Sequence, residues 1–335
     1  MSKKFGFGIF GCGMIASIHA EAIREIDSAE LIGVADVVAA NAEKMAEKCS
    51  CEVFADYEAM LSDPRVDIVC ICTPSGFHAD NALQALGHGK HVILEKPMAI
   101  TVEDADRVVN AVRESGCHLT VISQMRFSED VQKVKKLLKE NAFGKLAFCD
   151  LYMKYWRDPS YYASSNWRGT FKFDGGGALM NQGIHGVDLI MYLVGEAKLL
   201  KGRVKTRIHD IEVEDTAVAV LEYENGAIGV IEGSTSAYPG FDRRIEIQGD
   251  KGYVMLKENH ITELMINGEQ IPVEVEEKAA SGSSDPSAIG SYYHALQFRN
   301  MIETIRGNES LLVNAEDGRR AIKMILDIYK SSAEE

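Results

Sequence analysis

The sequence predicts an α/β protein with an N-terminal doubly wound parallel sheet and a C-terminal α+β domain with a large, mainly antiparallel sheet. Over the first 123 residues, near-continuous apolar runs alternate with helical patterns, as in parallel sheets covered on both faces. After residue 124 the strands instead alternate apolar and polar residues. A length of 335 residues suits two domains of roughly 150 residues each. We therefore expect domains at 1–123 and 124–335.

The apolar runs of the first domain mark its strands, which we place at 5–10, 30–36, 67–72, 91–95 and 118–123. Helical patterns lie between them, for example at 39–48 and 101–116. In the second of these, Thr101 is a suitable N-cap with Asp104 three residues later, and Gly116 is a suitable C-terminal stop.

The second domain begins with a predicted helix at 128–141 and continues with strands. Asn225-Gly226 separates two β-type runs, and Asn-Gly in that position is the strongest short-range signal for a hairpin. Asn267-Gly268 and the turn at 250–252 continue this pattern. Further helices are expected at 178–194, 288–306 and 315–331.

Composition excludes several classes of partner and compartment. Lysine and arginine number 36 against 50 acidic residues, a net charge of −14, which argues against nucleic acid and anionic membranes. No apolar run approaches the roughly 20 residues that span a bilayer, and the N-terminus contains no signal-peptide core. None of the seven cysteines forms a C-x-x-C pair, so we expect free thiols and a cytoplasmic location.

A glycine-rich loop follows the first strand and opens the first helix. It fits the pattern G-x-G-x-x-A, in which the glycines allow a tight turn and close approach of a pyrophosphate to a helix N-terminus. The residues predicted to bind the cofactor here are Gly11, Cys12, Gly13, Met14 and Ile15.

Asp36 ends the second strand, 20 residues after Ala16, where a carboxylate can accept hydrogen bonds from ribose hydroxyls. The next four residues, 37–40, contain no Arg or Lys that would pair with a 2′-phosphate. We therefore predict NAD rather than NADP as cofactor. The competing interpretation is a doubly wound domain that binds an unrelated ligand.

Polar and ionisable residues also follow the ends of the predicted strands at 67–72 and 91–95. Ligands bind at the carboxyl ends of parallel strands, so these residues are candidates for the cofactor site. Because the segment 124–127 opens the crossover between the domains, we expect Gln124 and Arg126 to border the nicotinamide pocket. Without that context, these segments would be simple strand-terminating turns with a surface lysine. The additional cofactor-binding candidates are Thr73, Pro74, His78, Glu95, Lys96 and Gln124.

In the second domain, G-G-G-A-L-M-N-Q-G-I-H-G-V-D places Asn181, His185 and Asp188 on one face of the predicted helix. Taken alone, His185 would be a satisfied structural histidine. The nine histidines show no metal-ligand spacing, so no metal site is expected.

Taken together in this order and spacing, G-x-G-x-x-A, T-P-x-x-x-H, E-K-P and G-G-G-A-L-x-x-x-G-x-H-x-x-D resemble the Gfo/Idh/MocA oxidoreductase family, over essentially the whole chain. The resemblance implies a Rossmann domain and a second domain with an open sheet whose exposed face mediates dimers or tetramers. It also implies that a nicotinamide cofactor exchanges hydride with a secondary alcohol or ketone of a sugar, cyclitol or sugar derivative.

The resemblance further implies that Lys96 hydrogen-bonds the reacting hydroxyl and that His185 is the acid/base. In this family a cis peptide bond commonly precedes the proline that corresponds to Pro97. Asn181 departs from the family, many members of which have Asp there. An amide holds a hydroxyl but takes no proton, so a Lys–Asp–His relay does not carry over intact. The stretch N-Q-G-I-H resembles a subset that includes UDP-linked N-acetylglucosaminuronate 3-dehydrogenases.

Substrate recognition is expected from an aromatic and basic segment of the second domain. Aromatic faces stack on sugar rings and arginine pairs with carboxylates or phosphates, although a core edge or subunit interface would use the same residues. The substrate-binding candidates are Tyr155, Arg157, Trp167, Arg168, Asn181 and Asp188.

The sequence therefore predicts a cytoplasmic, homo-oligomeric, NAD-dependent oxidoreductase for a small carbohydrate. Alternatives are a nucleotide-sugar dehydrogenase, a glycoside-processing enzyme that oxidises its substrate transiently, and a non-catalytic dinucleotide-binding sensor. Hydride leaves an alcohol carbon only as its hydroxyl proton is removed. Histidine titrates near neutrality, whereas lysine needs a lowered pKa, so either His185 or Lys96 can be the base.

Overall fold

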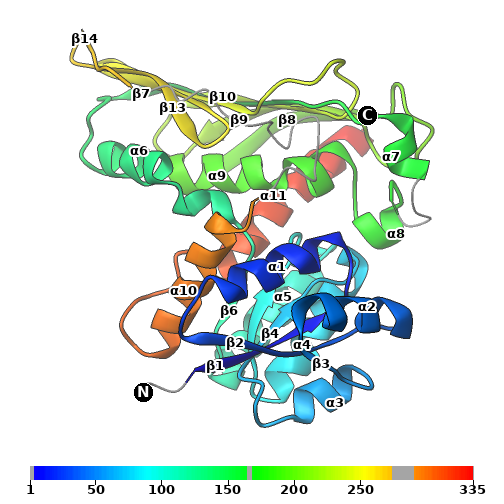
Figure 1. Ribbon diagram of the computed structural model, residues 1–335. Coiled ribbons are helices and arrows are strands. Elements are labelled where there is room, and N and C mark those ends of the chain that lie inside the picture. Colours follow the sequence, from blue (N-terminus) through cyan, green and yellow to red (C-terminus); the bar gives the residue numbers. More distant parts are fainter. Residues whose placement is uncertain (1–3, 164–167, 274–289, 335) are drawn as a thin grey trace. The chain divides into compact units, whose positions relative to one another are not determined.

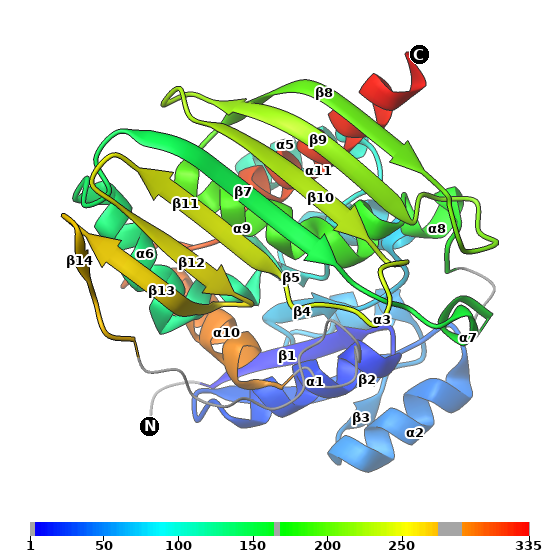
Figure 2. The same cartoon turned by 90° about the horizontal axis from the view of Figure 1, so that it is seen from above.

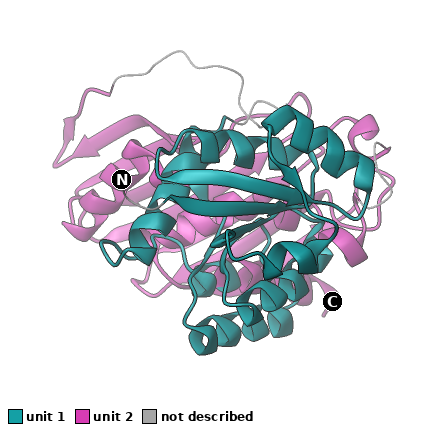
Figure 3. Ribbon diagram, turned by 60° about the horizontal axis from the view of Figure 1, so that its bottom comes forward, with its two compact units in different colours: residues 1–124, 290–319 teal, residues 125–289, 320–335 magenta. Residues whose placement is uncertain are grey.

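The computed structural model describes residues 4–163, 168–273 and 290–334. The chain forms two compact units (Figure 3). Unit 1 comprises residues 1–124 and 290–319, and unit 2 comprises residues 125–289 and 320–335. No helix in the described ranges is both long and apolar enough to cross a membrane.

Unit 1 is built on a six-stranded sheet in the order β3-β2-β1-β4-β5-β6, in which every pairing is parallel. Its order reverses between β1 and β4, which makes the loops after these strands the expected ligand site. The predicted parallel sheet is confirmed, and only the two-residue β3 was not anticipated. The strands are β1 (Phe5–Phe10), β2 (Ala29–Ala35), β3 (Glu52–Val53), β4 (Ile68–Ile71), β5 (His91–Leu94) and β6 (Leu119–Val121).

The helices of unit 1 cover this sheet (Figure 1). Helix α5 begins and ends as its sequence predicts: the Thr101 hydroxyl accepts the Asp104 N–H at 3.1 Å, and Gly116 has φ +68°. The other helices are α1 (Met14–Arg24), α2 (Ala39–Cys49), α3 (Tyr57–Ser62), the 3₁₀ turn η1 (Ser75–Phe77), α4 (His78–Gly87) and α10 (Tyr292–Ile305), with α5 at Val102–Ser115.

Helix α10 makes the units differ from the predicted domains, because residues 290–319 lie in unit 1 rather than with the rest of the C-terminal half. Ala295, Phe298 and Met301 join the core around α1 and β1. The Gln297 side chain also donates to the Thr120 hydroxyl at 2.7 Å and to the Val121 carbonyl at 2.8 Å. An apolar face predicts that a helix is buried on one side, but it does not predict which unit the helix packs against.

Unit 2 contains an eight-stranded sheet in the order β14-β13-β12-β11-β7-β10-β9-β8 (Figure 2). All pairings are antiparallel except β10 with β7. The two Asn-Gly turns connect β9 to β10 and β13 to β14, as predicted. The strands are β7 (Leu146–Lys154), β8 (Ala197–Lys205), β9 (Thr216–Tyr223), β10 (Ile228–Ser234), β11 (Arg244–Gly249), β12 (Gly252–Lys257), β13 (His260–Ile266) and β14 (Glu269–Gln270).

The helices α6 and α9 lie on one face of this sheet (Figures 1 and 2). The predicted helix at 178–194 is divided into a π-helical turn, η3, and the α-helix α9. The helical segments are the 3₁₀ turn η2 (Gln124–Phe127), α6 (Glu129–Lys139), α7 (Pro159–Ala163), α8 (Phe171–Asp174), η3 (Ala178–Gly183), α9 (Ile184–Val194) and α11 (Ala315–Ala333).

Candidate functional site

The loop from Gly11 to Gly13 has the backbone that a phosphate cradle requires. Gly11 adopts φ +91°, and a Cβ there would lie 2.7 Å from the carbonyl carbon of Cys72, so a side chain is excluded. A Cβ on Gly13, by contrast, would meet nothing within 4 Å. Gly13 is the N-cap of α1 and, as a glycine, has no side chain to accept the first N–H groups of the helix. The helix N-terminus therefore presents N–H groups and a positive dipole end to an approaching anion.

Asp36 is fixed directly beside this loop. Its Oδ2 accepts the Cys12 N–H at 2.7 Å and its Oδ1 accepts the Val38 N–H at 2.8 Å. Each carboxylate oxygen can accept a second bond, which leaves capacity for ribose hydroxyls. Burial, followed by the charge of Asp36, raises the pKa of Cys12 to about 12, so its thiol is not a nucleophile at neutral pH.

His78 ties together the two loops that follow β4 and β5. One ring nitrogen, Nε2, lies 2.7 Å from the Thr73 carbonyl, and the other, Nδ1, lies 2.6 Å from the Pro97 carbonyl. The side chain is buried, and burial lowers its pKa. The sequence predicts that His78 binds the cofactor, whereas in the structure both of its ring nitrogens face backbone carbonyls. It positions the loops instead.

The bond before Pro97 is cis, as the resemblance implied. Glu95 was also predicted to bind the cofactor, yet its carboxylate is buried and is hydrogen-bonded to His19 at 2.8 Å. Lys96, the next residue, is partly exposed. Gln124 is buried, and its Oε1 has no hydrogen-bond partner in the part of the chain that the structure describes.

These features fit a bound dinucleotide. The open side of Gly13 admits a pyrophosphate, and Asp36 stands where a ribose would follow. The unpartnered Gln124 Oε1 offers an acceptor for an amide such as the nicotinamide carboxamide.

In unit 2, the turn that precedes His185 is organised by a buried carboxylate. Glu214 accepts the N–H groups of Gly177 and Leu179, each at 2.8 Å, and the Tyr329 hydroxyl, also at 2.8 Å. These bonds anchor the start of η3. His185 lies in the first turn of α9 and is partly exposed.

Asn181 is oriented by Asp174, a residue that sequence reasoning missed. Its Nδ2 donates to Asp174 Oδ1 at 2.7 Å, and Asp174 Oδ2 accepts the Gly169 N–H at 2.7 Å. This carboxylate fixes the NH₂ end of the amide, and the carbonyl oxygen of Asn181 accepts a 3.5 Å hydrogen bond from the Gln182 amide; an amide oxygen can accept two hydrogen bonds.

An arginine and tyrosine network adjoins Asn181. Arg157 donates to the Gln182 side-chain oxygen at 2.8 Å, and the Gln182 amide donates to the Tyr161 hydroxyl at 2.8 Å. The Arg168 guanidinium lies 4.4 Å from the centroid of the Tyr161 ring. Tyr155 and Arg157 are buried, whereas Arg168 is partly exposed. Among these candidates, Arg168 is therefore the best placed to meet a ligand, and the predicted Trp167 lies outside the described residues.

Asp188, a predicted substrate ligand, is paired with another side chain of unit 2. Its carboxylate forms a bidentate ion pair with Arg126, at 2.9 and 2.5 Å, and both side chains are buried. The Arg126 guanidinium also lies 4.5 Å from the ring centroid of Tyr192. The pair fastens η2 to α9, and both carboxylate oxygens of Asp188 take part in it.

Comparison with known proteins gives consistent matches over both units. A family model described as "Oxidoreductase family, NAD-binding Rossmann fold" matches residues 5–123, and one described as "GFO/IDH/MocA C-terminal domain" matches residues 131–255. The myo-inositol 2-dehydrogenase of Thermotoga maritima is 27% identical over 98% of this chain and 96% of its own length.

Two solved structures are similar over the whole chain. The WlbA dehydrogenase of Bordetella pertussis, in complex with NADH and UDP-GlcNAcA, is 30% identical with a TM-score of 0.88, covering 100% of this chain and 97% of its own. WlbA of Chromobacterium violaceum, in complex with the same two ligands, is 31% identical with a TM-score of 0.88, covering 100% and 95%.

Proposed function

The chain belongs to the Gfo/Idh/MocA family of oxidoreductases, and we propose that Lys96 and His185 handle the proton of its reacting hydroxyl group. It is an NAD-dependent oxidoreductase that interconverts a secondary alcohol and a ketone on a sugar, cyclitol or sugar derivative. The observation that carries this function is the whole-chain similarity to dehydrogenases solved with NADH.

Unit 1 holds the cofactor in this proposal. The N–H groups at the start of α1 bind the pyrophosphate, and Asp36 accepts the ribose hydroxyls. The side-chain oxygen of Gln124 accepts a hydrogen bond from the carboxamide N–H, and this bond orients the nicotinamide ring. When bound, NAD supplies the hydride acceptor of the reaction.

The side chains of Lys96 and His185 act on the substrate oxygen. In the oxidising direction His185 removes the hydroxyl proton, and the positive charge of Lys96 stabilises the alkoxide that develops. Both side chains are partly exposed, as groups that meet a substrate must be. Asn181 accepts a neighbouring hydroxyl through its carbonyl oxygen and takes no proton itself.

For the substrate we propose a nucleotide-linked sugar acid, of which the UDP-GlcNAcA bound by WlbA is the example. WlbA matches this chain over its full length at higher identity than the inositol dehydrogenase above. Arg168 supports the proposal, because it is a partly exposed residue and a guanidinium is suited to a carboxylate or a phosphate.

A spectrophotometric screen of NAD reduction tests this function, with cyclitols, aldoses, free uronates and nucleotide-linked uronates as substrates. We expect turnover with the nucleotide-linked uronates at the lowest KM. Turnover confined to cyclitols or aldoses would overturn the substrate proposal but not the reaction. Tight NAD binding without turnover of any substrate would favour the dinucleotide-binding sensor.

We also propose that the enzyme works in the cytoplasm as a homodimer or homotetramer. All seven cysteines are free thiols, which suits a reducing compartment. The face of the unit 2 sheet opposite α6 and α9 supports association, since several of its apolar side chains are exposed.

A further inference from the structure

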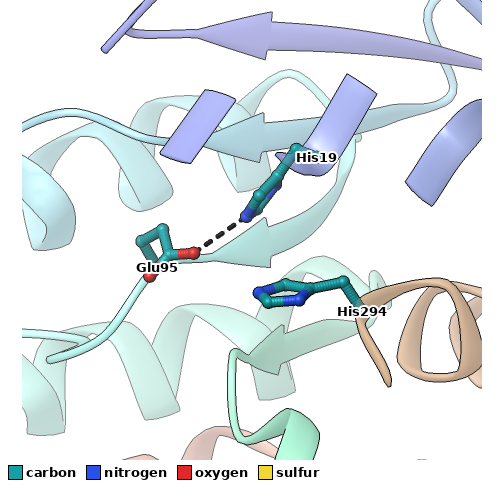
Figure 4. A group of neighbouring side chains, drawn as sticks. All are labelled: His19, Glu95 and His294. Carbon is teal, nitrogen blue, oxygen red and sulfur yellow. Dashed lines mark hydrogen bonds and ion pairs between the residues drawn. The ribbon is translucent and has the colours of Figure 1, made fainter. Parts of the chain in front are cut away.

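Three side chains from distant parts of the sequence meet inside unit 1: His19 from α1, Glu95 from the end of β5 and His294 from α10 (Figure 4). Their relative exposures are 0%, 6% and 1%. The proposed function uses none of these side chains directly. A buried carboxylate between two buried imidazoles is costly unless it is paired, so the cluster needs a physical explanation.

Glu95 links α1 to the backbone of the lysine loop. A carboxylate only accepts, so the 2.8 Å contact with its Oε1 requires a proton on His19 Nε2. Its second oxygen, Oε2, accepts the backbone N–H of Lys96 at 3.2 Å. The carboxylate therefore bridges two groups: one oxygen is hydrogen-bonded to His19, and the other to the backbone N–H of Lys96, the residue proposed to act on substrate.

Electrostatics keep this bridge charged. Burial by itself raises the pKa of Glu95, but the hydrogen bond and charge of His19 outweigh it, with help from His294 and Lys96, and lower the pKa to about 2. The anion persists at every physiological pH, and both of its hydrogen bonds are charge-assisted.

Helix α10 encloses the pair. The ring of Phe298 meets the His19 ring edge-on with centroids 5.1 Å apart, and the His294 ring lies at 5.7 Å. Burial, followed by the charge of His19, lowers the pKa of His294 to about 4, so at neutral pH it is an uncharged wall. A hydrogen bond that is shielded from water is stronger than an exposed one. This enclosure also gives a reason for the return of residues 290–319 to unit 1.

We propose that His19 and His294 are positioning residues that, through Glu95, fix the backbone of Lys96 and thereby align its ammonium group with the substrate oxygen. The inference rests on the proposed role of Lys96. One donor atom from each of the three side chains lies within 4.8 Å of the others, so a divalent metal is the rival occupant of the cluster. The 2.8 Å hydrogen bond between His19 Nε2 and Glu95 Oε1 favours a positioning role over a metal site, because these two atoms are already paired with each other.

The kinetic test compares His19→Ala with His19→Gln, whose amide can donate from the place of the lost Nε2–H. We expect His19→Ala to lower kcat at least about tenfold with KM and the Kd for NAD within about threefold, and His19→Gln to recover most of the loss. Met60→Ala, at a fully buried position of α3, is the matched control for lost stability and should keep its kcat. Equal kcat in all three variants and the wild type would overturn the inference.

A second readout needs no substrate. The lysines are ¹³C-methylated, and the Lys96 signal in the NMR spectrum is assigned with Lys96→Arg. We expect this signal to shift in His19→Ala and in His294→Ala and to return towards its wild-type position in His19→Gln. An unmoved signal would overturn the inference even if the enzyme is active. A signal that moves as expected in a protein that turns over no substrate would instead contradict the proposed function.

Metal content is measured on the same purified proteins. We expect substoichiometric zinc, iron and manganese in the wild type. One equivalent of metal that is lost in His19→Ala and His294→Ala would overturn positioning in favour of a metal site.

Discussion

We propose that the carboxylate of Asp36 determines which dinucleotide unit 1 accepts, because it is anchored by two backbone N–H groups and would repel an added phosphate. We predict that NAD binds at least about tenfold more tightly than NADP, about 1.4 kcal/mol. Asp36→Ser combined with Val37→Arg removes the repulsion and adds a cation at a fully exposed position, so the preference should move towards NADP. Calorimetry measures both constants, and equal affinities in the wild type would contradict the prediction.

The pair Lys96 and His185 is tested by a double-mutant cycle. Each alanine substitution should lower kcat by roughly 10²–10⁴, the range for removal of a positioned acid or base. The combined variant should be little worse than either single variant, since groups that act as a unit lose most function with the first removal. The Kd for NAD should change little in His185→Ala. Near-wild-type kcat in His185→Ala would show that the histidine is structural.

Asn181 offers a sharper version of this experiment. Asn181→Asp places a second carboxylate against Asp174, where the amide now donates at 2.7 Å, so the two acids must share a proton. The pH–rate profile should therefore shift, and the activity of His185→Ala should not be restored.

Buried His294 makes the stability of unit 1 depend on pH. Its folded pKa is about 4, below the ordinary value of 6.5, so the unfolded chain binds the proton more tightly. The contribution of the uncharged His294 side chain to the free energy of unfolding is complete above pH 6.5 and is lost as the pH falls towards 4. Between pH 7 and pH 5 the loss from this residue is about 2 kcal/mol.

We therefore expect the free energy of unfolding to fall less steeply with acid in His294→Gln than in the wild type, as measured by urea denaturation at several pH values. His91 also has its pKa lowered to about 4, chiefly by burial, but it is present in both proteins and cancels in the difference. Parallel pH profiles would contradict the prediction.

Single residues show where sequence reasoning stops. Gly11, Gly13 and Asp36 were predicted to lie around one loop because the spacing of their motif is local, and the structure places them there. The partners of Asp188 and His78, namely Arg126 and the carbonyls of Thr73 and Pro97, were not foreseen because they come from other elements. A polar residue that a long-range partner occupies has the same local pattern as one that awaits a ligand.

At the scale of elements, the loop between β1 and α1 provides a matched pair of substitutions. In Gly11→Ala the Cβ would be 2.7 Å from the Cys72 carbonyl carbon at φ +91°, so we expect the protein to lose at least about 1 kcal/mol of stability. Gly13→Ala should fold normally, because its Cβ meets nothing within 4 Å, yet it should weaken NAD binding at least about tenfold by occupying the space for the pyrophosphate.

Thermal unfolding and calorimetry separate the two effects. If Gly13→Ala bound NAD as tightly as the wild type, the open space beside Gly13 would not be the pyrophosphate site. A fully stable Gly11→Ala would show that the loop relaxes around the new methyl group.

Elements whose signals are local were predicted well. The caps of α5 and the two Asn-Gly hairpins depend on residues a few positions apart, and the structure confirms them. The π-helical turn η3 was not foreseen, because Glu214, which anchors it, is more than 30 residues away in the sequence. The assignment of α10 to unit 1 depends on packing partners nearly 300 residues earlier, which no periodicity reveals.

For the molecule as a whole, one face of the unit 2 sheet exposes apolar side chains that a monomer leaves in contact with water. Its strands bury alternate residues on one face, as β9 does with Ala217, Ala219 and Leu221. On the other face Phe148, Val218, Val220 and Ile228 are 37–51% exposed, and Ile228 pairs directly with Phe148 across β10 and β7. Exposed apolar side chains that adjoin one another across several strands are typical of a protein interface.

A second copy of the chain is the expected cover, because one patch meeting its own counterpart across a two-fold axis satisfies both surfaces at once. Light scattering should therefore give twice or four times the 36.9 kDa of one chain at micromolar concentration. Val220→Lys combined with Ile228→Lys places charges inside that contact and should shift the mass towards the monomer. Val53→Lys, at a similarly exposed position in unit 1, is the matched control and should leave the mass unchanged. A wild-type monomer would contradict the association itself, whereas an oligomer that survives the double substitution would place the interface on another surface.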